Sequence, residues 1–507
     1  MDSLIELNLY GRDYEQELRP LIRAFLPHSE FEVNFYEAEE EPMRELCREE
    51  PTLLLAANAA YEYTFSCILM NDWFRIRVYR LGERIGSADA DNVNPERKAY
   101  RNRVAREIYR ILAADTGVAL PWGILTGVRP TKLIYEGLEA GETRSALEAR
   151  LRDEYLVSEE KIATGFQVAM REREILTGMN YRGGYSIYIG IPFCPTTCHY
   201  CSFTSYPVER FGAMRDAYLD ALTKELEYLG GCMPGRRLQT IYIGGGTPTA
   251  LSEEQLERLL QTVRRCLTMQ DCIEFSVEAG RPDSITERKL QLLKEYGVTR
   301  ISVNPQSMQQ RTLDLIGRRH TVRQIVDAMH MARAAGHDNI NMDIIIGLTG
   351  ECPDDVRDTL AQIAELDPDS LTVHTLARKR AARLTTNKEE YEGLDAQGVP
   401  EMLRASIDFC REHAYLPYYL YRQKNMADNL ENVGYARLGK EGIYNILIME
   451  EKQTILAAGA GAMSKFVFHD EDRIERVENV KSLTDYIGRI DEMIGRKKAF
   501  FEANEGL

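Results

Sequence analysis

The chain has 507 residues, of which 44% are hydrophobic and 28% are charged, the usual composition of a soluble globular protein. This length suffices for about three domains and a large core. The formal net charge of −16 argues against broad nucleic-acid binding, and no apolar run reaches the roughly 18 residues that would cross a membrane.

The N-terminal segment and the cysteines indicate the cellular compartment. The first residues, MDSLIELNLYGRDYEQE, are acidic and amphipathic, and they lack the basic region and the long apolar region of a signal peptide. The ten cysteines are mostly isolated in a long chain, which is not the pattern of a disulfide framework. We therefore expect a cytoplasmic protein with free thiols, and neither nucleic acid nor a membrane as a partner.

The first part of the chain, residues 1–95, predicts a small α/β domain. Four of its apolar runs are expected to be strands, at 5–9, 31–35, 65–70 and 74–80. Residues 96–182 predict a mostly helical and charged linker region, which a loop rich in Gly and Pro interrupts at 120–132.

From residue 183 to 385 short apolar strands alternate with amphipathic helices. Six strands are expected, at 186–193, 238–243, 273–278, 300–304, 340–346 and 371–375. Two of the helices between them begin with capping boxes, at 252–255 and 321–324. This alternation predicts an α/β fold with a parallel sheet, and six units predict a partial (β/α)6 barrel. Residues 386–507 are expected to form a mixed, largely helical C-terminal domain.

Three cysteines with C-x3-C-x2-C spacing, Cys194, Cys198 and Cys201, directly follow the first barrel strand. Three thiolates can hold three irons of a 4Fe–4S cluster, which leaves the fourth iron free to bind a small molecule. Two other interpretations are a zinc site with a distant fourth ligand and ordinary buried thiols. Zinc sites usually have a second Cys-x2-Cys pair, which the sequence lacks.

Other polar or glycine-rich positions follow the later strands, where the chemistry of such barrels is located. Taken singly, each is explained as well by a turn or by a solvated side chain. Together they are expected to line one rim: Gly245, Gly246 and Thr247 in GGGTPT, then Glu278, Gln306, Arg318 and Asp343.

These motifs resemble the radical S-adenosylmethionine (SAM) superfamily and, more closely, the oxygen-independent coproporphyrinogen III oxidase family. The resemblance is strongest over 185–380, and the segments 120–133, 372–384 and 421–436 extend it to the HemZ-type coproporphyrinogen dehydrogenase branch. It implies a 4Fe–4S cluster on the three cysteines and SAM on the open iron. It also implies that SAM contacts Tyr188, Gly245, Gly246, Thr247, Glu278, Gln306, Arg318 and Asp343.

The sequence departs from the family pattern at three places. Gly190 stands where the family usually has His, and Cys201-Ser202-Phe203 lacks the further cysteine of the best-studied branch. The stretch 444–449 lacks the H-N-x-x-Y-W motif of the heme-chaperone branch.

The resemblance implies oxidative decarboxylation of two propionates of coproporphyrinogen III to vinyl groups, giving protoporphyrinogen IX in heme biosynthesis. A low-potential donor such as flavodoxin or ferredoxin would supply electrons. A heme-binding chaperone and a radical SAM enzyme with another substrate are the alternatives. The cationic run containing Arg378 and Arg380 is a candidate site for substrate carboxylates, and a solvated charge run is the alternative interpretation.

Overall fold

A computed structural model of the chain forms two compact units. The first contains Met1–Phe166 and Arg422–Asn429, and the second contains Gln167–Tyr421 and Leu430–Leu507. In the described part of the chain, no helix is both long and apolar enough to span a bilayer. The structure describes residues 4–27, 29–39, 41–44, 58–377, 396–423 and 430–504.

The first unit is an α/β domain, as the sequence predicts. Its five strands form one sheet in the order β2-β1-β3-β4-β5. The strands are β1 (Leu4–Gly11), β2 (Glu30–Tyr36), β3 (Tyr63–Leu69), β4 (Phe74–Arg80) and β5 (Glu83–Ala90). Strand β5 was not predicted, because an edge strand with half its surface in solvent shows little apolar alternation. Helices α1 (Glu15–Phe25) and α3 (Arg97–Thr116) pack against each other in this unit.

Three further helices follow in sequence, α4 (Lys132–Glu139), α5 (Arg144–Asp153) and α6 (Glu159–Thr177). The chain passes from the first unit to the second within α6, after Phe166. The expected linker region 96–182 is therefore divided between the two units. A helical pattern alone does not indicate which core a helix packs against.

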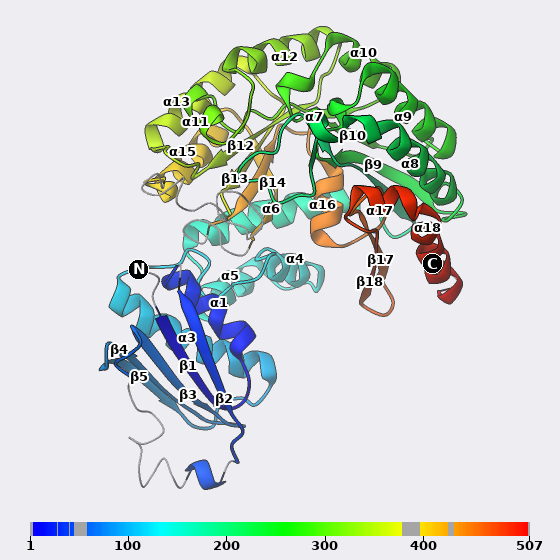
Figure 1. Ribbon diagram of the computed structural model, residues 1–507. Helices are drawn as coiled ribbons and strands as arrows, with labels where there is room; N and C mark the ends of the chain where they lie inside the picture. Colours follow the sequence, from blue (N-terminus) through cyan, green and yellow to red (C-terminus); the bar gives the residue numbers. More distant parts are fainter. Residues whose placement is uncertain are drawn as a thin grey trace. The chain divides into compact units, whose positions relative to one another are not determined.

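The second unit contains the predicted partial barrel. Six consecutive strands run parallel: β6 (Gly184–Ile191), β9 (Arg237–Gly245), β10 (Glu274–Glu278), β11 (Arg300–Ser302), β12 (Ile340–Ile346) and β13 (Ser370–Thr375). Helices cover the outer side of this curved sheet in Figure 1. They include α8 (Arg215–Leu229), α9 (Glu253–Cys266), α10 (Glu287–Glu295), α12 (Val322–Ala334) and α13 (Pro353–Leu366).

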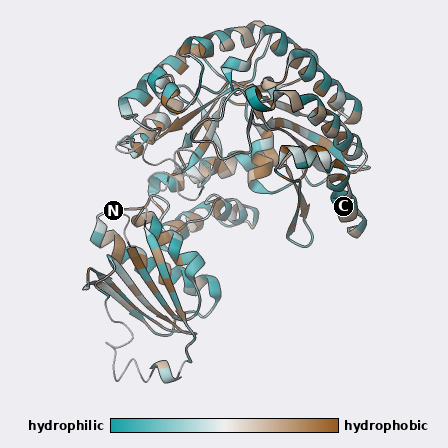
Figure 2. Cartoon of the chain, in the orientation of Figure 1, coloured by the Kyte–Doolittle hydropathy of each residue, from teal (hydrophilic) through white to brown (hydrophobic). Residues whose placement is uncertain are grey.

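The pattern of buried residues explains why these segments form helices over a sheet. In α9 the residues Leu256, Leu259, Leu260 and Val263 are buried, and both predicted capping boxes are present. Burying each such side chain contributes about 1.5–3 kcal/mol. Figure 2 shows largely hydrophobic strands and helices of mixed hydropathy, as expected for amphipathic helices on a buried sheet.

The C-terminal residues extend the barrel sheet at both edges. Strands β15 (Asn432–Ala436) and β14 (Leu416–Tyr421) continue it antiparallel beyond β13. Strand β16 (Thr454–Ala458) lies parallel to β6, and β17 (Met463–Phe468) and β18 (Arg473–Glu478) follow. The expected separate domain from residue 386 is therefore corrected: these strands share the barrel sheet and its compact unit. Sequence patterns predict strands but do not identify their partners.

Four helices accompany these C-terminal strands: α15 (Val399–Glu412), α16 (Ile443–Glu450), α17 (Leu483–Gly488) and α18 (Ile490–Ala503). A buried ion pair connects α18 to α8, with Lys497 Nζ 2.6 Å from Glu225 Oε1 and both side chains fully buried. The same carboxylate accepts hydrogen bonds from Tyr486 and from the backbone of Gly459. Glu225 therefore fixes the turn that follows β16.

Candidate active site

The three cysteines lie on one loop at the C-terminal end of the first barrel strand. Beyond β6 the residues Phe193–Cys194 form a short strand, β7, that pairs in parallel with β8 (Tyr206–Pro207). Cys198 and Cys201 lie in the loop between β7 and β8, and the backbone N–H of Cys201 donates to Cys198 O at 3.0 Å. None of these three described thiols forms a disulfide, and all three are half-buried.

Backbone contacts anchor this loop to the segment after helix α11 (Gln310–Leu315). The N–H of His199 donates to Ile316 O at 2.9 Å, and Nδ1 of its ring lies 3.0 Å from Leu315 O. A carbonyl only accepts, so the ring proton is on Nδ1. Gly317 has φ +75°, and a Cβ at this glycine would lie 2.5 Å from the His199 ring. His199 therefore fixes the loop in place.

A buried arginine that sequence analysis did not single out also contacts the loop. Arg281 is 3% exposed, and its Nη1 lies 3.1 Å from Thr196 O and 3.6 Å from Cys198 Sγ. Its Nη2 forms an ion pair with Asp283 at 2.7 Å. The sequence contained an indication, because Arg281 follows Glu278 in EAGRP at a predicted strand end.

The glycine run after β9 packs directly on the cysteine loop. The backbone N–H of Gly246 donates to Ile191 O at 2.8 Å, and that of Thr247 donates to Phe193 O at 2.7 Å. Thr247 Oγ1 lies 3.8 Å from Cys194 Sγ. A Cβ at Gly246 would lie 2.6 Å from Phe193 O, so this close approach requires glycine.

Glu278, at the end of β10, accepts two hydrogen bonds from the neighbouring strand. Tyr242 donates to Oε1 at 2.6 Å, and the N–H of Gly245 donates to Oε2 at 3.2 Å. Burial raises the pKa of Glu278 to about 7, and the nearby carboxylate of Asp343 adds to this rise. Near neutral pH this carboxyl therefore changes charge.

Three tyrosine rings form a stack beside Glu278. The rings of Tyr242 and Tyr444 lie 4.6 Å apart, and those of Tyr188 and Tyr242 lie 6.2 Å apart. Tyr444 comes from α16 and is 4% exposed. Sequence analysis predicted only Tyr188, since the positions of Tyr242 and Tyr444 depend on which elements become neighbours. This tyrosine stack forms an aromatic surface beside Glu278 in the candidate active site.

Gln306 has an unusual backbone and an unsatisfied side chain. Its φ is +68°, a conformation that costs a non-glycine residue about 1–3 kcal/mol. Its backbone N–H donates to Asp343 O at 2.9 Å. Among the described residues, its buried Oε1 has no hydrogen-bond partner, nor has Oδ1 of the nearby Asn304. Such atoms are acceptors available to a bound ligand.

Arg318 connects the cysteine loop to two strand ends. Its Nη1 donates to Tyr200 Oη at 3.1 Å, and Tyr200 lies between the second and third cysteines. Its Nη2 donates to the carbonyls of Gly280 at 2.8 Å and Asn304 at 2.9 Å. Arg318 is 2% exposed, so its charge is fixed within the protein.

Asp343, on β12, is held by two side chains. The amide of Asn341 donates to its Oδ1 at 2.6 Å, and Nε2 of His374 lies 3.7 Å from its Oδ2. Burial raises the pKa of Asp343, but the hydrogen bonds and the charge of His374 outweigh burial and hold this pKa below its ordinary value. Asp343 is therefore ionised at neutral pH, whereas Glu278 is protonated in a large fraction of the molecules.

Of the eleven residues predicted for the cluster and for SAM, Tyr188 and Asp343 lie within β6 and β12, and the others lie at the C-terminal ends of barrel strands or on loops beyond them. Contacts between different strands or loops of this set include Thr247 to Cys194, Gly245 to Glu278, and the backbone of Gln306 to Asp343. Arg378 and Arg380 lie outside the described residues.

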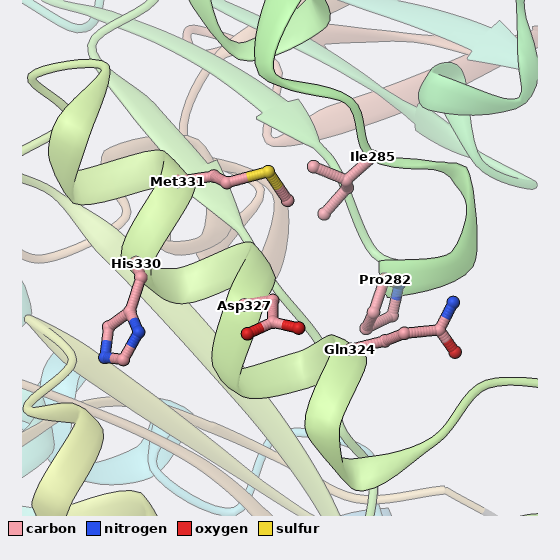
Figure 3. Close-up of a pocket in the computed structure, with 6 residues that line it drawn as sticks. All are labelled: Pro282, Ile285, Gln324, Asp327, His330 and Met331. Atoms are coloured by element: carbon pink, nitrogen blue, oxygen red, sulfur yellow. The ribbon is translucent and has the colours of Figure 1, made fainter.

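A separate surface pocket does not include any of these residues. Its volume is about 520 Å³, and it lies between η3 (Pro282–Ser284) and α12. Figure 3 shows its lining residues, which are Pro282, Ile285, Gln324, Asp327, His330 and Met331.

The donor set fits a cluster with a bound small molecule. Among the described residues, no three His, Cys, Asp or Glu side chains converge as the ligands of a single metal ion would. A 4Fe–4S cluster differs from such a site, because each thiolate binds its own iron. The unpartnered Gln306 Oε1 and the glycine run beside the thiols suit a ligand on the remaining iron.

Comparison with known proteins identifies the family. Residues 188–363 match the model of the radical SAM superfamily. The chain is 42% identical over 409 residues to the oxygen-independent coproporphyrinogen-III oxidase-like protein HemZ of Bacillus subtilis, covering 80% of this chain and 82% of that protein. The chain belongs to this radical SAM family. The predicted cofactors, a 4Fe–4S cluster and SAM, are those of the superfamily.

Two further comparisons cover smaller parts of the chain. The heme chaperone HemW of Bacillus subtilis is 38% identical over 192 residues, which cover 38% of this chain and 50% of that protein. The structure of coproporphyrinogen III oxidase (HemN) from Escherichia coli matches with a TM-score of 0.50 and 24% identity, covering 64% of this chain and 73% of that one. This structural match confirms the predicted fold class.

Proposed function

We propose that this protein is an oxygen-independent coproporphyrinogen III dehydrogenase that produces protoporphyrinogen IX in heme biosynthesis. The observation that carries the proposal is the 42% identity to HemZ over 80% of the chain, which extends far beyond the barrel. In the reaction, two propionate side chains each lose carbon dioxide, one hydrogen atom and one electron, and each becomes a vinyl group. An electron acceptor takes up the two electrons, one from each propionate.

Cys194, Cys198 and Cys201 are proposed to hold three irons, and SAM is proposed to bind the fourth. When bound and reduced, the cluster and SAM supply the 5′-deoxyadenosyl radical that removes the hydrogen atom. The protein binds, orients and shields the reactants. The half-buried carboxylate of Glu278 and the buried Oε1 of Gln306 suit the amine or ribose of SAM, and the glycine run lets the backbone approach it closely.

The remaining partners follow from the same proposal. A low-potential flavodoxin or ferredoxin in the cytoplasm is proposed to reduce the cluster. Arg378 and Arg380 are proposed to pair with substrate propionates, because guanidinium groups bind carboxylates in a bidentate manner. Changing both to Ala tests this assignment, and unchanged affinity for coproporphyrinogen III would remove it.

The second candidate function is heme binding by a chaperone, which the similarity to HemW over 192 residues favours. Residues 444–449, where the chaperone branch has its H-N-x-x-Y-W motif, lie in α16. In this chain Tyr444 is buried in the tyrosine stack, and neither His nor Trp occurs in that stretch. This departure supports the enzymatic proposal over the chaperone.

An anaerobic assay tests the proposal. Reconstituted protein is incubated with SAM, dithionite, coproporphyrinogen III and an electron acceptor, and protoporphyrinogen IX is measured by chromatography. Product formation that disappears in Cys198→Ala supports the dehydrogenase. SAM cleavage without a tetrapyrrole product would refute it, and tight heme binding by the same preparation would then support the chaperone.

A further inference from the structure

Arg281 is a positive charge placed beside the proposed cluster without being a ligand. Its Nη1 points at Cys198 Sγ from 3.6 Å, and the side chain is 3% exposed. A guanidinium remains protonated in proteins. Because little water surrounds it, its field on the nearby sulfur is weakly screened.

A positive charge that donates to a ligand sulfur has a predictable effect on a cluster. One-electron reduction makes the cluster more negative by one charge. A donor to a ligand sulfur and a nearby cation stabilise this added charge, and hydrogen bonds to sulfur and net charge are known determinants of cluster potential. Arg281 therefore favours the reduced state, which makes the potential less negative.

Asp283 opposes this effect in a measurable way. Its carboxylate accepts from Nε of Arg281 at 2.9 Å and from Nη2 at 2.7 Å, on the side away from Nη1. It therefore partly neutralises the guanidinium, and among the described residues it forms no hydrogen bond to a cysteine. Removing the arginine charge and removing the aspartate charge should thus shift the potential in opposite directions.

We propose that Arg281 is a positioning residue that sets the reduction potential of the cluster through its hydrogen bond to Cys198, with Asp283 limiting the shift. This inference rests on the proposed assignment of Cys198 as a cluster ligand. It does not depend on which substrate the radical attacks. The physiological consequence is that Arg281 determines how strong a reductant the enzyme needs.

A purely mechanical role is the alternative, because Arg281 also holds the loop. Nη1 donates to Thr196 O at 3.1 Å, and Thr196 Oγ1 in turn donates to Gly317 O at 3.1 Å. The same hydroxyl accepts from Nη1 and Nη2 of Arg281 at 3.2 and 3.1 Å. Thr196→Val removes these hydroxyl contacts with the loop and keeps the guanidinium charge. It is therefore the matched control for loss of loop anchoring.

The experiment is an anaerobic redox titration of the reconstituted full-length protein, followed by the electron paramagnetic resonance signal of the reduced cluster in the absence of SAM. We expect Arg281→Gln to lower the ratio of reduced to oxidised cluster at a given potential at least tenfold, which is about 59 mV for one electron. Asp283→Asn should shift the potential in the positive direction. Thr196→Val and the exposed Arg288→Gln, on the outer helix α10, should leave it near wild type.

Two results would overturn the inference. One is an unchanged potential in Arg281→Gln, and the other is a shift of the same sign in Arg281→Gln and Asp283→Asn. If Arg281→Gln fails to assemble a cluster, Asp283→Asn decides by itself, and a potential at or below the wild-type value refutes the inference. Loss of decarboxylation with these shifts intact would refute the proposed substrate but not the role of Arg281.

Discussion

The charge of Glu278 should control SAM affinity near neutral pH. Burial raises the pKa of this carboxyl to about 7, although Tyr242 and the N–H of Gly245 donate to it. We expect the ionised form to bind the amine or ribose of SAM. The perturbation is therefore a change from pH 8 to pH 6, compared between wild type and Glu278→Gln.

The expected magnitude follows from the fraction of protein in the ionised form. With a pKa of about 7, Glu278 is ionised in about 90% of molecules at pH 8 and in about 10% at pH 6. The apparent Kd is the intrinsic Kd divided by the competent fraction, so it should rise about tenfold between these pH values.

Equilibrium dialysis of SAM against anaerobically reconstituted protein measures this change. The amino group of SAM has its own pH dependence, which Glu278→Gln retains, so only the difference between the two proteins reports on Glu278. We expect the variant to bind SAM more weakly than wild type at pH 8. Its apparent Kd should also lack the tenfold rise between pH 8 and pH 6 that the ionisation of Glu278 causes in wild type. An identical pH dependence in both proteins would refute the assignment.

The same raised pKa predicts a cost in stability. The folded protein holds the proton of Glu278 at pH values where the unfolded chain has released it. Its contribution is therefore most favourable below about pH 4.5 and is lost as pH rises through about 7. At pH 8, Glu278→Gln should increase the free energy of unfolding by up to about 3 kcal/mol. This increase should appear as a higher Tm. An unchanged or lower Tm at pH 8 would contradict this cause.

Two further predictions concern the packing around the site. Lys497→Met leaves the carboxylate of Glu225 buried without its counter-charge, so it should reduce the free energy of unfolding by about 3–5 kcal/mol. Urea denaturation measures this loss, and a loss below about 1 kcal/mol would contradict the ion-pair argument. Gly246→Ala places a Cβ 2.6 Å from Phe193 O and should reduce both iron content and SAM affinity at least tenfold, while Gly488→Ala, with open space around it, should change neither.

Much of the site could be predicted because its residues occur at strand ends. Cys194, Glu278 and Gln306 lie at the C-terminal end of parallel strands or just after them, and the topology of a βαβ barrel brings such positions to one edge. Short-range patterns therefore sufficed to bring together residues that are far apart in sequence. The capping boxes are equally local and were predicted correctly.

The parts that were missed depend on long-range pairing. Arg281 acquires its importance only when the loop after β10 meets the cysteine loop, and no periodicity encodes that contact. Tyr444 joins the tyrosine stack because α16 packs near β9, about 200 residues earlier in the chain. For the same reason, the sequence pattern did not show that β14–β18 continue the barrel sheet.

The pairing of β16 with β6 has a consequence for the order of biosynthesis. Ser186 on β6 donates to Gln453, which lies 267 residues later, so the strand that leads into the cysteine loop acquires its second neighbour only after β16 has been translated. Until then β6 presents an open edge, which is a site for aberrant association. Iron delivered to a nascent chain would therefore reach the cysteine loop while β6 still lacks its neighbour β16. We expect productive metallation to follow the synthesis and pairing of β16.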